Sequence, residues 1–305
     1  MNAAGSNSFS ASLCERALRI YSRFAPTERG GYRLARAARK TRPRDSWRSV
    51  FHTPDGFDID LDISDYPDIC MAYGLYELDT ARLIKRLLKR GDHFVDCGAN
   101  IGYFTLLAAQ CVGAGGKIDA FEPQAANFAR LRENLKRNGL LDRATLHAMA
   151  LADREGSVDL FRPSDKVDNH GTSSMFPDPE WQSRAGQGTG ASATTTQVRT
   201  ARLDHVLAGA KPKLIKIDVE GAEPLVAEGM RGLLSRDHAG DSPPMIILEF
   251  NPPKSAVAGF DATEAVRRLL DARSDYQIFT VGWRLKRVTI DELKSLSQIN
   301  VLLRV

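Results

Sequence analysis

The sequence predicts an α/β protein built on a mostly parallel sheet with helices on both faces, and three observations predict it. First, Phe94 and Val95 form an apolar run that ends at Asp96, before a glycine turn and a helical apolar pattern. Second, another short apolar run at 117–121 ends at an acid. Third, a buried-strand pattern at 214–219 ends among carboxylates. Parallel strands bring such ends to one edge of the sheet, where open sheets bind ligands.

The turn after the first strand contains Gly98, Asn100 and Gly102. A dinucleotide fingerprint that begins at Gly98 would need glycines where Asn100 and Tyr103 stand, so the turn does not match it. Glycines let the backbone approach a ligand closely, Asn100 both donates and accepts hydrogen bonds, and Asp96 can accept from an ammonium group. The turn therefore favours an amino-acid moiety over a pyrophosphate.

Glu122 closes the second strand, 122 − 98 = 24 positions after Gly98. An acid about 20 residues beyond the glycine turn accepts hydrogen bonds from ribose hydroxyls in nucleotide-binding folds. The ligand predicted by both features is a nucleoside that carries an amino acid, which describes S-adenosylmethionine.

Five segments, in order and at the right spacing, resemble the FkbM family of S-adenosylmethionine-dependent methyltransferases: VDCGANIGYFTLLAA, AFEPQAANFARLRENLKRN, ALADREGSVDLF, LIKIDVEGAE and IILEF. The resemblance implies a Rossmann-like class I methyltransferase fold, with a mostly parallel seven-stranded sheet and an antiparallel last strand. It also implies O-methylation of a hydroxyl on a sugar, glycan or polyketide-like metabolite. The residues expected to hold the cofactor at the first two strand ends are Asp96, Gly98, Ala99, Asn100, Gly102 and Glu122.

Further cofactor contacts are expected on either side of these strands. A GLYE-like segment that ends at Glu77 is similar to one that lies across the cofactor in the family, so Glu77 is a candidate for the methionine end; the alternative is a capping residue. Met149, Ala150 and Asp153 follow the third strand and are candidates for the adenine side. The alternative for Asp153 is an acid in a simple turn.

Three carboxylates, Asp218, Glu220 and Glu223, follow the strand at 214–219. Like charges raise one another's pKa, so such a cluster indicates a binding or catalytic role. We predict that Asp218 and Glu220 orient an acceptor hydroxyl and take up its proton. His170, in a long loop, is the third catalytic candidate; the alternative is an exposed histidine without a role.

An all-oxygen group formed by Asp218, Glu249 and Asn251 could instead hold Mg²⁺. The preferred interpretation uses no metal, because methyl transfer from a sulfonium mainly needs alignment and exclusion of water.

Three segments are expected along the chain: a basic, partly helical arm at 1–50, a lead-in strand and helix at 51–90, and the methyltransferase domain at 91–305, with a lid-like insertion at 162–200. The Gly/Ala/Thr/Ser-rich part of that insertion, 185–196, is expected to be a flexible loop. Other expected strands lie at 51–63, 144–149, 156–161, 245–250, 277–281 and 299–303, and helices at 80–89 and 124–137.

The arm carries most of the positive charge. Residues 1–50 contain eleven Lys and Arg against three acids, 11 − 3 = +8, whereas the whole chain is +4. A helix there would place on one face Leu13, Ala17, Ile20, Tyr21 and Phe24. Such a helix could pack on the domain, rest on an anionic membrane or on a lipid carrier, or mimic an organellar transit peptide.

Composition indicates an ordinary globular chain, with 43% hydrophobic and 26% charged residues and no apolar run near the roughly 18 residues that span a bilayer. Its four cysteines show no C-x-x-C spacing, which favours a cytoplasmic location, with the arm as a peripheral contact at the inner face of a membrane. No nucleic-acid partner is expected, since no aromatic stacking platform is evident. The alternatives are a nicotinamide-dependent oxidoreductase and a non-catalytic cofactor-binding protein; oligomeric state is open.

Overall fold

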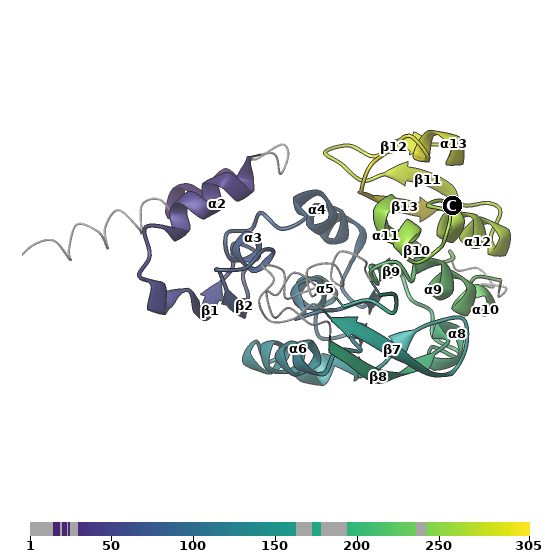
Figure 1. Cartoon of the computed structure of the whole chain (residues 1–305), viewed down its shortest axis with the longest axis horizontal. Coiled ribbons are helices and arrows are strands. Elements are labelled where there is room, and N and C mark those ends of the chain that lie inside the picture. The colour runs from purple at the N-terminus through teal and green to yellow at the C-terminus, as the bar shows by residue number, and fades with distance from the viewer. Residues whose placement is uncertain are drawn as a thin grey trace, which may run out of the picture.

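The main structural element is an eight-stranded sheet, seen in a computed structural model that describes residues 15–18, 20–22, 24, 30–162, 173–177, 194–235 and 242–305 (Figure 1). The strand order is β12-β11-β13-β10-β9-β3-β4-β5. In chain order the strands are β3 (His93–Cys97), β4 (Lys117–Phe121), β5 (Ala144–His147), β9 (Leu214–Ile217), β10 (Met245–Phe250), β11 (Gln277–Thr280), β12 (Lys286–Val288) and β13 (Ile299–Arg304).

The five strands from β10 to β5 are parallel, and β13, β11 and β12 add three antiparallel pairings. The predicted α/β class and mostly parallel sheet are confirmed, as is the antiparallel last strand. The predicted count of seven was wrong for the described part of the chain. The additional strand, β12, has only three residues, too few to produce a periodic pattern.

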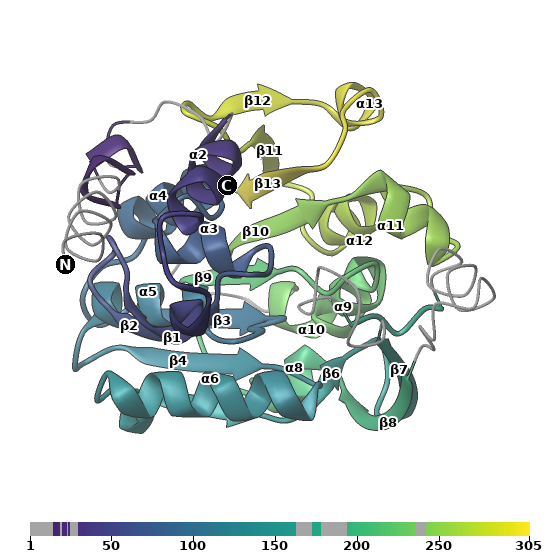
Figure 2. The same ribbon diagram turned by 60° about the vertical axis from the view of Figure 1, so that its left-hand side comes forward.

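The sheet is buried on both faces, because alternate side chains of β3 enter two different cores: Phe94 packs into one, and Val95 and Cys97 into the other. The first core is covered by α4 (Leu78–Leu87), α5 (Tyr103–Val112) and α6 (Ala125–Arg137). The helices α8 (Leu203–Val206), α9 (Glu223–Gly229), α10 (Arg231–Leu234) and α12 (Glu264–Ala272) cover the second core. Figure 2 shows this layering with α6 across the front.

Two small sheets flank the large one. The predicted strand or hairpin at 51–63 is an antiparallel pair, β1 (Arg48–His52) and β2 (Asp58–Asp62). After β5, the short β6 (Ala150–Leu151) runs parallel to β8 (Thr194–Ala201), which pairs antiparallel with β7 (Gly156–Arg162). The predicted loop was therefore wrong at 194–196, which lie in β8. Most of the predicted lid, 163–172 and 178–193, lies outside the described residues.

The remaining elements are α2 (Gly31–Arg39), α3 (Asp68–Ala72), α11 (Pro252–Val257), α13 (Ile290–Leu293) and the 3₁₀ turns η1 (Arg44–Ser46) and η2 (Leu141–Arg143). No helix among the described residues is long and apolar enough to cross a membrane. The division of the chain at residues 50 and 90 stays a prediction, although β1 begins within the predicted arm.

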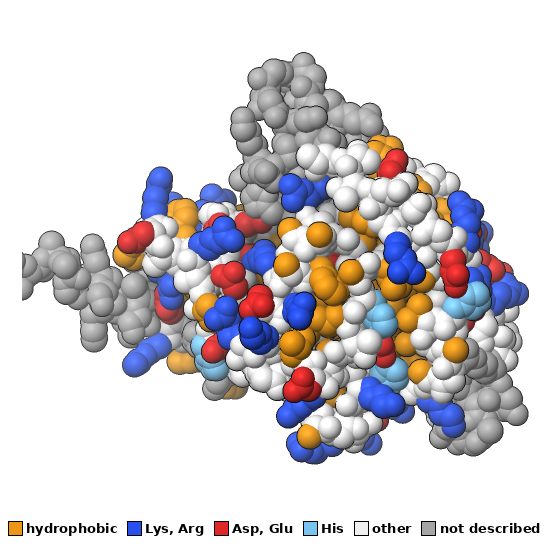
Figure 3. Space-filling view, turned by 90° about the horizontal axis from the view of Figure 1, so that it is seen from below, with side chains coloured by type: hydrophobic (Ala, Val, Ile, Leu, Met, Phe, Trp, Pro, Cys, Tyr) orange, Lys and Arg blue, Asp and Glu red, His pale blue; other side chains and the backbone are white. Residues whose placement is uncertain are grey.

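Figure 3 shows the face to which α6 and the β7–β8 pair contribute. Hydrophobic side chains form a band across its middle, with histidines beside them. Charged side chains of both signs are mixed on the side toward the amino-terminal arm, so this face is not one continuous basic surface.

Candidate functional site

The glycine turn between β3 and α5 packs directly against the end of β9. Gly98 has φ +88°, and a Cβ there would lie 1.8 Å from the carbonyl oxygen of Asp218. Gly102, with φ +97°, would place a Cβ 2.7 Å from Leu131 Cδ1. Asn100 also has a positive φ, of 50°. Glycine is required at 98 by both conformation and space, but the close neighbour is the backbone of Asp218 rather than the ligand expected from the sequence.

The backbone amides of this turn are already used within the protein. Gly98 and Ala99 both donate to the carbonyl oxygen of Phe121, at 3.1 and 2.9 Å, and Gly102 donates to that of Ala99 at 2.9 Å. The amide of Asn100 donates to Glu122 Oε2 at 2.8 Å. A pyrophosphate would find these four N–H groups occupied, which disfavours the nicotinamide alternative.

Glu122 lies at the end of β4 with its carboxylate held by two backbone amides. Besides Asn100 N on Oε2, Oε1 accepts from Gln124 N at 2.8 Å. Burial raises the pKa of Glu122 to about 7, although the two N–H donors oppose the rise. Each carboxylate oxygen keeps a second lone pair, so two further donors, such as a pair of ribose hydroxyls, can bind here.

One cleft joins the ends of β3, β4, β6 and β9. It holds about 900 Å³ between its walls, counting the solvent at its open side, within the range of small-molecule sites. Of the predicted site residues, the cleft is lined by Gly98, Ala99, Asn100, Glu122, Ala150, Asp218 and Glu220. Met149 and Leu151 line it beside Ala150, and Asn100 Oδ1 is buried without a hydrogen-bond partner in the described structure.

Lys216 also lines the cleft, although it was not among the site residues predicted from the sequence. The residue is 2% exposed, its Nζ donates to Asp218 Oδ2 at 2.8 Å, and the same atom lies 4.8 Å from the ring centre of Phe104. Burial alone would lower the pKa of Lys216, but the carboxylates of Asp218, Glu77 and Asp96 outweigh it and raise the pKa. The positive charge of Lys216 therefore partly neutralises these three carboxylates.

Asp96 lies beneath the cleft rather than in its lining. Its Oδ2 accepts from Thr105 Oγ1 at 2.6 Å, and its buried Oδ1 has no hydrogen-bond partner among the described residues. Burial raises the pKa of Asp96, and Lys216 opposes the rise. Its charge can act on a ligand through the Lys216 cluster. Gly102 likewise supports the turn without lining the cleft.

Glu77 is the residue before α4 and has the left-handed conformation, with φ 40°. Its side chain makes no capping hydrogen bond to the helix. Its Oε2 accepts from Asn300 Nδ2 at 2.7 Å, and burial followed by Asp218 raises its pKa, while Lys216 lowers it. Tyr76, just before it, lines the cleft and packs edge-on against Tyr103. The GLYE-like segment therefore reaches the cleft through Tyr76, next to the predicted Glu77.

The carboxylates after β9 divide into two roles. Glu223 accepts from the amides of Val219 and Gly221, at 3.0 and 3.1 Å, and so stabilises the loop itself. Glu220 lines the cleft and pairs with Lys254 Nζ at 3.5 Å. Burial, followed by the charge of Asp218, raises the pKa of Glu220 to about 7, while Lys254 opposes the rise.

Glu249, at the end of β10, is the most strongly perturbed of these acids: burial, then the charge of Asp218, raises its pKa to about 9. Its Oε1 accepts from Gln298 Nε2 at 2.6 Å. Asn251, the third member of the proposed magnesium group, uses its Oδ1 to accept from Lys254 N and cap α11. Among the described residues no three His, Cys, Asp or Glu side chains form a metal-binding group.

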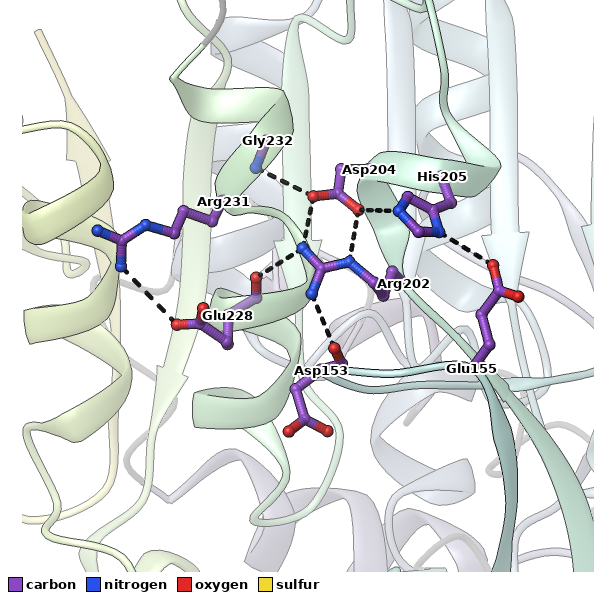
Figure 4. A network of polar contacts seen from close by, with 8 residues as sticks. All are labelled: Asp153, Glu155, Arg202, Asp204, His205, Glu228, Arg231 and Gly232. Carbon is purple, nitrogen blue, oxygen red and sulfur yellow. Dashed lines mark hydrogen bonds and ion pairs between the residues drawn. The ribbon is translucent and has the colours of Figure 1, made fainter.

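Asp153 lies outside the cleft lining and belongs to a polar network shown in Figure 4. Its backbone carbonyl accepts from Arg202 Nη1 at 2.7 Å, and the same guanidinium forms a two-point contact with Asp204 at 3.1 and 2.8 Å. Asp204 also accepts from Gly232 N at 3.0 Å. The network fixes the turn after β6 to α8 and α10, and the carboxylate of Asp153 points away from it. Asp153 is not among the residues that line the cleft, and its predicted adenine contact stays a prediction.

A short described part of the insertion reaches the cleft. Ser173 and Met175 line it, and Ser174 Oγ donates to the carbonyl oxygen of Glu220 at 2.8 Å. Ser174 also exchanges two backbone hydrogen bonds with Phe161 of β7. These contacts bring residues 173–175 to the cleft beside Glu220, and the predicted lid stays a prediction. His170 lies outside the described residues, so its predicted role stays a prediction.

Residues 96–278 match the family model described as the methyltransferase FkbM domain. No curated protein matches the chain.

Similar solved structures include the methyltransferase FkbM from Methylobacillus flagellatus KT, with 16% identity over 80% of this chain and a TM-score of 0.44; the match spans 56% of that protein's chain. A putative rRNA-methylase from Clostridium thermocellum has 14% identity, 74% and 92% coverage and a TM-score of 0.42. The O-methyltransferase from Bacillus cereus in complex with SAH has 15% identity, 74% and 80% coverage and a TM-score of 0.40.

Proposed function

Because this chain belongs to the FkbM methyltransferase family, we propose that it binds S-adenosylmethionine and methylates a hydroxyl on a sugar, glycan or polyketide-like metabolite. The observation that carries the proposal is a single cleft in which the glycine turn, Glu122 and the Lys216–Asp218 pair meet. Each of these fits a different part of the methyl donor.

The cleft residues offer chemical groups that suit the ribose, the adenine and the positively charged groups of S-adenosylmethionine. Glu122 has free lone pairs for the ribose hydroxyls, and the side chains of Met149, Ala150 and Leu151 offer an apolar wall to the adenine. The orphan Oδ1 of Asn100 is an acceptor inside the cleft. A cluster that contains more carboxylates than cations favours a ligand with a positive sulfonium and an ammonium group.

The reaction needs little covalent chemistry from the protein. The donor supplies an electrophilic methyl group, whose bond to sulfur breaks as its bond to the acceptor oxygen forms. The chain's residues align the acceptor, exclude water and remove the hydroxyl proton. Met71, Tyr76 and Met175 supply apolar walls around this region.

Asp218 and Glu220 are the proposed acceptor-side residues. Both line the cleft, and a pKa near 7 is well suited to a general base that works at neutral pH. Of the two, we choose Glu220 as the base that removes the proton of the acceptor hydroxyl, because Asp218 already accepts a hydrogen bond from Lys216. His170 remains a third candidate for this step.

The first test measures cofactor binding by titration calorimetry with S-adenosylmethionine, S-adenosylhomocysteine and NAD. Wild-type protein should bind the first two and not NAD, and Glu122→Gln should weaken binding by at least about tenfold, since a hydrogen bond to a charged group contributes about 1.5–3 kcal/mol. Glu133→Gln, an exposed change on α6, is the matched control. Unchanged affinity in a folded Glu122→Gln protein would refute the assignment of the cleft.

The second test identifies the acceptor with donor carrying a labelled methyl group in cell extract. Label is expected in glycan or small-metabolite fractions, and Glu220→Gln should lose turnover while keeping cofactor affinity. Label confined to nucleic acid would contradict the acceptor class. Cofactor binding without turnover on any fraction would favour the non-catalytic alternative.

A further inference from the structure

The amino-terminal arm presents an apolar stripe away from the domain. The described residues between 15 and 24 are helical, and Leu18 and Ser22 face inward, buried to 5% and 4% exposure. Arg82 Nη2 donates to the carbonyl oxygen of Ser22 at 3.4 Å. Ile20 and Phe24, one helical turn apart, are 60% and 76% exposed. Leu18 and Tyr21 pack on the hydrophobic core, as one of the alternatives drawn from the sequence expects, but this packing leaves Ile20 and Phe24 exposed.

Helix α2 also turns one face away from the domain, and this face carries basic side chains. Its small residues Ala35 and Ala38 are fully buried, while Arg33, Arg36 and Lys40 are exposed on the opposite side. Tyr32 and Leu34, at 40% and 46% exposure, flank these basic residues. Large apolar side chains are thus exposed beside cations, which is the pattern of interfacial helices.

Both helices belong to one end of the molecule. The Arg42 guanidinium, just after α2, pairs with Glu15 in the arm helix, and Figure 1 shows α2 at one extremity of the long axis. We name the exposed set the arm surface: Ile20, Phe24, Tyr32, Arg33, Leu34, Arg36 and Lys40.

We propose that the arm surface binds an anionic lipid bilayer, with Ile20 and Phe24 inserted at the headgroup level and the basic side chains among the phosphates. The charge of the arm selects this occupant: eleven Lys and Arg against three acids give residues 1–50 a net +8, and each cation near an anionic surface contributes to attraction. A second copy of the chain fits less well, because a two-fold interface would face this positive surface with itself.

Vesicle co-sedimentation of the full chain tests the proposal. The protein should bind vesicles of phosphatidylcholine mixed with phosphatidylglycerol, bind pure phosphatidylcholine weakly, and dissociate as salt rises. The pair of substitutions Ile20→Asp and Phe24→Asp should lower partitioning at least about tenfold, the expected loss when buried apolar side chains of this size are removed.

Matched variants separate charge from apolar insertion. The triple change Arg33→Glu, Arg36→Glu and Lys40→Glu should abolish the preference for anionic vesicles. Val305→Asp, a 61% exposed apolar residue at the carboxyl terminus and far from α2 along the long axis, should leave binding unchanged. Thermal midpoints equal to wild type show that each variant is folded.

Three results would overturn the proposal. One is equal binding to both vesicle types by wild type and all variants. Another is absence of vesicle binding together with a change of oligomeric state in the Ile20 and Phe24 variant, which would assign the surface to a second copy. The third is salt-sensitive binding of RNA, with no vesicle binding, that is unaffected by the apolar substitutions.

Discussion

At the scale of single residues, the turn at Gly98 joins the fold to the cleft. We predict that Gly98→Ala destabilises the protein by more than about 3 kcal/mol, since a backbone atom 1.8 Å from the new Cβ must move. Gly91→Ala is the control: Gly91 has φ +90° but no atom within 4 Å of a built Cβ, so it should cost about 1 kcal/mol. Urea unfolding measures both, and equal losses would show that conformation alone requires glycine at 98.

The position of a residue in its strand decided whether it could be identified from the sequence as a cleft residue. Gly98, Glu122 and Asp218 were predictable, because each stands at a strand end where a pattern marks it. Lys216 was not: a lysine inside an apolar strand needs buried partners, and besides Asp218, two residues further on, these are Glu77 and Asp96 from distant segments. Such a residue is itself a signal, since Lys is almost never fully buried unless it is paired.

A second prediction concerns Asp119 of β4. His93 Nε2 and His147 Nε2 lie 2.8 and 2.7 Å from its two carboxylate oxygens. Burial alone would raise the pKa of Asp119, but the hydrogen bonds of His147 and His93 lower it to about 2. Because the folded pKa lies below the unfolded value of 3.8, its stabilisation is present above about pH 4 and is lost as the pH falls toward 2.

Asp119→Asn should therefore lower the free energy of unfolding by about 1–2 kcal/mol at neutral pH. The difference from wild type should shrink as the pH falls below about 4. Urea unfolding across this range measures it, and a difference independent of pH would assign the effect to packing rather than to charge.

At the scale of elements, α6 supplies the hydrogen bonds that the edge of β2 lacks. Asn134 Oδ1 accepts from Asp60 N at 2.9 Å, and its Nδ2 donates to the carbonyl oxygen of Ile101 at 2.9 Å. One turn later, Asn138 exchanges two hydrogen bonds with the backbone of Asp58. Two amides spaced by one helical turn thus connect α6 to the hairpin of β1 and β2, and Asn134 also connects α6 to the glycine turn.

We predict that Asn134→Ala costs about 1–3 kcal/mol of unfolding free energy, because it leaves a buried N–H and C=O without partners. Glu133→Ala, exposed on the neighbouring face of α6, should cost less than about 0.5 kcal/mol. Chemical denaturation compares them. A small loss at Asn134 would mean that water replaces its contacts.

Elements with long periodic patterns were predicted closely. β10 has the predicted bounds, and α6 begins one residue after its expected start because Gln124 caps it. β12 and α3, with three and five residues, were missed because so few positions show no period. β8 begins inside a Thr-rich run that composition marks as loop; pairing with β7 along seven residue pairs makes it a strand.

At the scale of the whole molecule, buried glutamates make stability depend on pH. The pKa values of Glu122, Glu220 and Glu223 are raised to about 7 and that of Glu249 to about 9, in each case mainly by burial. The folded state then holds protons that the unfolded state has lost. Their stabilisation is complete below the unfolded pKa of 4.5 and is lost as the pH rises through about 7 to 9.

Unfolding temperatures of the protein without cofactor should therefore fall by several degrees between about pH 6 and about pH 9. Ionised carboxylates attract a positive ligand, so S-adenosylmethionine should restore more stability at the higher pH than S-adenosylhomocysteine, which has the same ribose and amino acid but no sulfonium charge. Glu249→Gln should reduce the fall of the unfolding temperature at alkaline pH. Equal effects of the two ligands at both pH values would show that the cluster does not sense the sulfonium.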